Sequence, residues 1–84
     1  MFLKSMIPII KKAMDYKLYN LHTYKGYDGA DILKLSFKDP SEMVVIRNHC
    51  RSLGHATNTL KDNSLTVLYC IFEPITDIYT LKED

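Results

Sequence analysis

The chain has 84 residues, of which 46% are hydrophobic and 25% are charged, the ordinary balance of one small globular domain. Its 11 basic and 10 acidic residues give a net charge of +1, which argues against a dedicated nucleic-acid binder, because such proteins usually carry a clear basic excess. Lys4 follows Phe2-Leu3 at once, so the start does not resemble a signal peptide, and no apolar run approaches membrane-spanning length. We therefore expect a cytoplasmic protein with no membrane partner.

The first part of the chain predicts one helix followed by a β-hairpin. Residues 8–16 are expected to be helical, because Pro8 suits the first helical turn, where its missing N–H is not needed. Residues 17–24 and 30–37 alternate apolar and polar side chains and predict two strands. The glycine-containing segment 25–29 between them predicts the turn of an antiparallel hairpin.

The clearest local pattern is the start of a second helix. Asp39 is expected to cap this helix, with Pro40 at its first position and Glu42 reaching back to the backbone of the cap. Gly54 predicts its end. The apolar residues at helical spacing form the predicted buried stripe: Met43, Ile46, Cys50 and Leu53.

The rest of the chain predicts a second hairpin and a short tail. Residues 55–61 read as a polar strand, 62–63 as a two-residue turn and 64–72 as a strongly apolar strand. Residues 75–84 can add a short C-terminal helix. The apolar strand belongs in the centre of the sheet and polar strands suit its edges.

The predicted fold is therefore α+β: a two-layer sandwich of order α-β-β-α-β-β, forming a single small domain from residue 1 to 84. Its four-stranded mixed sheet has the order 1-2-4-3, and both helices lie on one face.

A series of short motifs runs from residue 33 to 72. A strand leads to Asp39-Pro40, then to a helix that carries Cys50, then to the pair Gly54-His55 and a hairpin. In this order the chain resembles the small sulfur-carrier family called TusA or SirA-like. The resemblance implies the strand order 2-4-3 and a sulfur-relay activity. The position of that family's sulfur-bearing cysteine falls on Ser5, and a serine cannot carry a persulfide, so Cys50 or Cys70 would have to replace it.

The sequence predicts no catalytic residue, no metal ligand and no cofactor. His49, Cys50 and His55 are close in sequence, but neighbouring helical residues diverge by about 100°, whereas a metal site needs three or four converging ligands. Cys50 and Cys70 have apolar neighbours and are expected to be inert core residues. The three glycines are isolated turn residues and form no phosphate-binding loop.

Two helices can cover only one face of such a sheet. We assign Leu33, Leu35 and Phe37 to the covered face, together with Leu65, Val67, Tyr69 and Ile71. The uncovered face is then expected to carry Ile32, Leu68, Cys70 and Phe72. An apolar patch of this kind can be covered by the tail through Ile75, Ile78 and Leu81, by a second copy in a homodimer across a two-fold axis, or by a different protein. We take the patch as a sign of association.

The leading hypothesis is a non-enzymatic interaction module, an adaptor, inhibitor or regulator that binds a larger protein. Its residue usage is typical of an AT-rich genome, phages included, which would place it in a host cytoplasm. The expected interaction residues are Tyr19, Tyr24, Tyr27, Arg47, Arg51, Leu68 and Phe72. One alternative is a degenerate sulfur-relay protein that uses Cys50 or Cys70. The other is a nucleic-acid binder that uses the Arg47 and Arg51 helix face.

Overall fold

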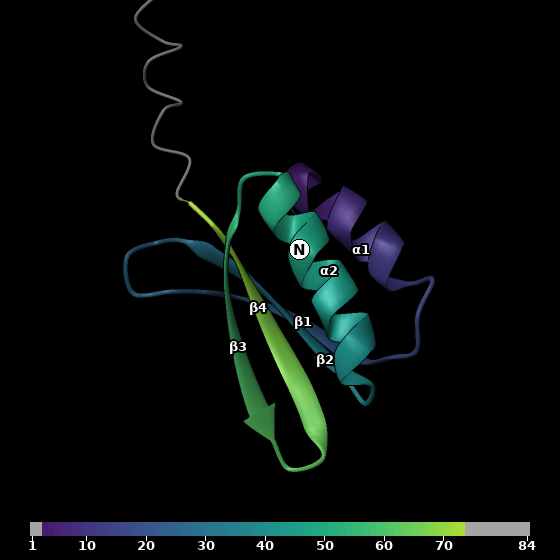
Figure 1. Cartoon of the computed structure of the whole chain (residues 1–84). Helices are drawn as coiled ribbons and strands as arrows, with labels where there is room; N and C mark the ends of the chain where they lie inside the picture. The colour runs from purple at the N-terminus through teal and green to yellow at the C-terminus, as the bar shows by residue number, and fades with distance from the viewer. Residues whose placement is uncertain (1–2, 74–84) are drawn as a thin grey trace, which may run out of the picture.

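The computed structural model describes residues 3–73. The elements follow in the order η1 (a 3₁₀ turn, Lys4–Met6), α1 (Ile7–Ala13), β1 (Leu18–Lys25), β2 (Asp31–Phe37), α2 (Pro40–Ser52), β3 (Ala56–Asp62) and β4 (Leu65–Phe72). The four strands form one sheet in the order β1-β2-β4-β3, which confirms the predicted topology. Both helices lie on the same face of this sheet (Figure 1). The expected C-terminal helix lies outside the described residues.

Every pair of neighbouring strands is antiparallel, so the sheet is antiparallel and the expected mixed sheet is wrong. The connection from β2 through α2 does bring β3 back in the direction of β2. However, β4 lies between these two strands and pairs with both, so the two parallel strands never touch.

α2 begins as its sequence predicts, with one difference. The Asp39 carboxylate accepts hydrogen bonds from the Ser41 N–H (2.9 Å) and the Ser41 hydroxyl (2.7 Å), which caps the helix and lowers the pKa of Asp39. The Glu42 side chain does not complete a capping box. Its Oε1 accepts the N–H of Lys17 at 3.2 Å and so ties the start of α2 to the segment before β1. Gly54 follows α2 with φ of +89°, as expected for a helix end.

The second hairpin is shifted by one residue from its predicted position. Asp62 pairs with Leu65, so Asn63 and Ser64 form the loop in place of residues 62–63. Asn63 has φ of +58°, a conformation that asparagine adopts more readily than most residues.

The hydrophobic core lies between the two helices and the covered face of the sheet. The helices contribute Met6, Ile9, Ala13, Met43, Ile46 and Cys50, and the strands contribute Leu33, Leu35, Phe37, Leu68, Cys70 and Phe72. The predicted stripe of α2 is thus confirmed at three of its four positions, whereas Leu53 is exposed.

The predicted facing of β4 is wrong, because its two sides are exchanged. Leu68, Cys70 and Phe72 lie in the core under the helices, where Leu68 pairs with Leu35 and Cys70 with Leu33. The uncovered side of β4 therefore carries Leu65, Val67, Tyr69 and Ile71. β4 is apolar at both alternating sets of positions, so its hydrophobic pattern could not show which set points to the helices.

Candidate interaction surface

The uncovered face of the sheet combines apolar and aromatic side chains from all four strands. Strand alternation and pairing place Tyr24 of β1 beside Ile32 of β2, and Ile32 beside Ile71 of β4. One row further along β4, Tyr69 lies between Lys34 of β2 and Asn58 of β3. Neither α1 nor α2 covers this face (Figure 1).

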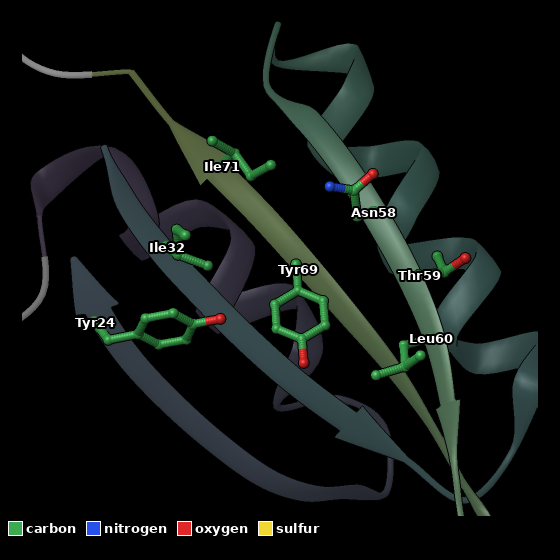
Figure 2. A pocket seen from close by; sticks show the side chains of 7 residues that line it. All are labelled: Tyr24, Ile32, Asn58, Thr59, Leu60, Tyr69 and Ile71. Carbon is green, nitrogen blue, oxygen red and sulfur yellow. The ribbon is translucent and has the colours of Figure 1, made fainter. Parts of the chain in front are cut away.

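A groove of about 420 Å³ runs across this face. The residues that line it come from all four strands and are Tyr24, Ile32, Asn58, Thr59, Leu60, Tyr69 and Ile71. Figure 2 shows the Tyr24 ring reaching across the sheet toward Tyr69, with Leu60 approaching from the opposite side. We call this surface the open-face groove.

The tyrosines of the groove are partly buried and partly exposed to solvent. Burial raises the pKa of Tyr24, and the neighbouring Tyr69 raises it further. The Lys34 ammonium lies 5.9 Å from the centre of the Tyr69 ring, within the range of a cation–π contact. A partner in this groove would therefore meet aromatic rings, phenolic hydroxyl groups and one positive charge.

A second hollow of about 460 Å³ adjoins the groove at the β1–β2 turn. It shares Tyr24 and Ile32 with the groove and adds Lys25, Gly26 and Tyr27. Tyr27 stands fully exposed at the turn, and Lys25 forms an ion pair with Asp31 at 3.0 Å. The hollow extends the apolar surface toward the end of the hairpin.

The structure separates the predicted interaction residues into three groups. Tyr24 lines both hollows, and Tyr27 lines the second one. Tyr19 is exposed on β1, and the Lys38 ammonium lies 5.4 Å from the centre of its ring. Arg47 and Arg51 lie on α2, in the helical layer. Leu68 and Phe72, expected on the open face, are 0% and 2% exposed and belong to the core.

Sequence reasoning missed several lining residues of the groove, chiefly Tyr69, Ile71, Leu60 and Asn58. A signal for Tyr69 was present in its hydroxyl group, which needs a hydrogen-bonding partner when buried and so favours a face with access to water. β3 has no regular alternation of apolar and polar residues, so its sequence could not show on which face Leu60 lies.

Cys50 and Cys70 are both 0% exposed and are free thiols. The two thiols come together in the core. The pKa of Cys70 is raised mainly by its hydrogen bond with the Cys50 thiol and, to a smaller extent, by burial. Reactive cysteines are accessible thiolates. The arrangement thus fits inert core cysteines better than a sulfur-carrying thiol, while the resemblance to the sulfur-carrier family remains a prediction.

His55 belongs to the packing of the covered face. Its ring centre lies 4.1 Å from that of Phe72, and burial lowers the pKa of His55. Within residues 3–73, no group of three or more histidine, cysteine or acidic side chains is placed to hold a metal ion. The helices in this same part of the chain include none that is long and apolar enough to cross a membrane.

Comparisons with protein families, with curated proteins and with solved structures found no match to this chain.

Proposed function

We propose that this protein is a non-enzymatic interaction module that binds a larger protein through the open-face groove. The observation that carries the proposal is the position of Tyr24, Ile32, Leu60, Tyr69 and Ile71 in one groove, on the face that neither α1 nor α2 covers. Tyrosine and large apolar side chains are typical of the centre of protein interfaces.

The composition of the groove favours binding over catalysis. Its seven lining residues include no acidic residue, histidine, cysteine or lysine, the side chains most often used for acid–base or nucleophilic catalysis. They offer instead aromatic and aliphatic surface, with hydroxyl and amide groups that can form hydrogen bonds with a partner. An adaptor, inhibitor or regulator needs only such a surface.

The proposal is tested with a variant that changes the groove and leaves the core intact. Tyr24 and Leu60 are 44% and 53% exposed, so Tyr24→Ala combined with Leu60→Ser should leave the fold unchanged. Leu53→Ser is the matched control, because Leu53 is also 44% exposed but lies at the end of α2. Each full-length form is used as bait in a lysate of the cells in which the protein is made.

Quantitative mass spectrometry then compares what the three baits retain. We expect a protein that the wild type and Leu53→Ser recover equally and that the groove variant loses by about tenfold or more. Equal recovery by all three baits would overturn the proposal for this groove.

A second copy of the chain is the competing occupant, and light scattering of the purified protein distinguishes it. A wild-type dimer that the groove variant converts to a monomer would show that the groove is used for self-association, against our proposal of a larger partner. A monomer for all three forms is the expected result.

A further inference from the structure

A second surface, which shares β3 with the open-face groove, lies where α2 meets β3 on the helical side of the sheet. β3 is the last strand of the sheet within residues 3–73, and in this part of the chain its backbone pairs with β4 on one side and with no strand on the other. Figure 2 shows α2 behind β3, and Figure 1 shows that the two elements are close where α2 ends and β3 begins. Alternate residues of β3 therefore point toward the helical layer, namely Thr57, Thr59 and Lys61, which pair with Cys70, Leu68 and Thr66.

One flank of α2 brings positive charge to this edge. Arg51 donates a hydrogen bond from Nε to the Thr57 hydroxyl at 2.9 Å, which fixes the guanidinium over the start of β3. Arg47 is four residues earlier and therefore lies on the same flank, one helical turn away. Its Nε is buried and has no hydrogen-bond partner among the described residues.

The spacing of helix and strand continues this arrangement along β3. The two elements run in opposite directions, because only residues 53–55 join them. Four helical residues rise by about 6 Å, and two strand residues advance by about 6.6 Å. This spacing lets the Arg47 side chain extend toward Thr59, two residues beyond the Arg51 contact with Thr57, and Lys61 is the next residue on that side of the strand. We call Arg47, Arg51 and Lys61 the β3 basic row.

The β3 basic row has no acidic counterpart in the part of the chain that the structure describes. The one ion pair within residues 3–73 joins Lys25 to Asp31, at the far end of the other hairpin. Asp62, the acidic residue of β3, alternates to the opposite face of the sheet with Leu60. The three positive side chains of the β3 basic row are thus spaced along the edge of β3 at about the distance between every second residue of a β-strand.

We propose that the edge of β3 binds an extended acidic peptide, which adds to the sheet as a fifth strand and directs alternate carboxylates to Arg51, Arg47 and Lys61. Addition of a strand uses the free backbone groups of the edge for affinity and the alternating side chains for specificity. The intervening residues of the peptide would lie beside Leu60 on the other face, so apolar residues suit these positions.

An extended peptide fits this surface better than a nucleic acid does. The free N–H and C=O groups of β3 match those of another strand, whereas a phosphate backbone has acceptors but no N–H donors. The net charge of +1 also gives little general attraction for a polyanion. The other edge, β1, is less suited to strand addition because a register shift between Leu18 and Asn20 interrupts its regular pairing.

The test uses a blocked synthetic peptide, Thr-Glu-Val-Glu-Val-Glu-Thr, and a matched peptide with Gln in place of each Glu. Binding to the full chain is followed by NMR through the backbone amides. We expect the Glu peptide to shift the amides of β3 (Ala56–Asp62) and the Gln peptide to bind at least about tenfold more weakly. N-methylation of the alternate peptide nitrogens whose N–H groups would donate to the backbone of β3 should abolish binding, because it removes the hydrogen bonds of the added strand.

Two protein variants make the result specific to the basic row. Arg47→Gln with Lys61→Gln should weaken binding of the Glu peptide about tenfold. The thermal melting curve should stay close to that of the wild type, because the Arg47 Nε has no hydrogen-bond partner among the described residues and Lys61 is exposed. Lys11→Gln with Lys12→Gln removes the same charge from α1 and should leave binding unchanged.

Three outcomes would overturn this proposal: equal binding of the Glu and Gln peptides, equal weakening by both pairs of substitutions, or tighter binding of a single-stranded oligonucleotide at β3 than of the Glu peptide. None of these outcomes bears on the open-face groove. The two proposals can therefore fail separately.

Discussion

The two sides of β4 show how one strand serves both the stability of the fold and the proposed function. On the covered side, Leu68, Cys70 and Phe72 are buried against α1 and α2. On the other side, Tyr69 and Ile71 are half-buried and line the groove. Both sides are apolar, yet α1 and α2 cover only one of them.

The difference teaches that hydrophobicity alone does not identify the core side of a central strand. The covered side belongs to the hydrophobic core that both helices share, whereas the open side pairs within the described residues with its neighbours in the sheet. Val67 on the open side is itself only 2% exposed, but Tyr69 and Ile71 are half-buried. These two side chains therefore contribute less to folding and can be changed at a small cost in stability. This freedom is what a binding surface requires.

The largest expected effect comes from shortening a side chain on the covered side. Leu68→Ala should lower the free energy of unfolding by about 2–5 kcal/mol, because the residue is 0% exposed and its removal leaves a cavity. In a domain of this size such a loss is a large part of the total stability. Ile71→Ala on the open side should cost about 1 kcal/mol, since Ile71 is only half-buried. Denaturant unfolding of both variants measures the difference, and equal losses would contradict the assignment of the two sides.

A smaller effect is expected from pH, through His55 on the covered side. Burial lowers the pKa of His55 in the folded state, so the unfolded chain binds a proton first as the pH falls. The free energy of unfolding should therefore be highest above the ordinary histidine pKa of about 6.5, and it should decrease as the pH falls from there through the lower folded pKa.

His55→Phe tests this assignment because it keeps an aromatic ring against Phe72 and removes the titration. Thermal melts of the variant between neutral and mildly acidic pH should decline less than those of the wild type. Parallel declines for the two proteins would show that another group causes the pH dependence.

The smallest effect on stability is expected on the open side. Tyr24→Ala with Leu60→Ser should change the free energy of unfolding by about 1 kcal/mol or less, because both side chains are largely exposed. The same pair of substitutions should remove binding to the partner. A loss of stability as large as that of Leu68→Ala would mean that the groove is part of the fold's core and not a free surface.

The order and topology of the elements could be predicted from the sequence because local signals marked them. Asp39-Pro40 and Gly54 set the limits of α2, and the polar character of β3 placed it at an edge. The facing of β4 could not be predicted, since it depends on the register between β2 and β4, and an all-apolar strand accepts either side.

The candidate sites were predicted only in part for the same reason. Tyr24 was identified from its residue type, but its neighbour Tyr69 was assigned to the wrong side together with the rest of β4. The arginines of α2 were recognised as a charged face, but their relation to the edge of β3 depends on the hydrogen bond between Arg51 and Thr57, a contact between two elements. Such contacts arise only after the elements have packed.

The most direct test of the central claim compares thiol accessibility on the two sides of β4. In the native wild-type protein, Cys50 and Cys70 should react with a thiol reagent only through unfolding, and therefore slowly. A cysteine introduced by Tyr69→Cys, one position away from Cys70, should react more than about a hundred times faster. If the native cysteines reacted as rapidly as the introduced one, the covered and open sides would be assigned wrongly, and the open-face groove would lose its basis.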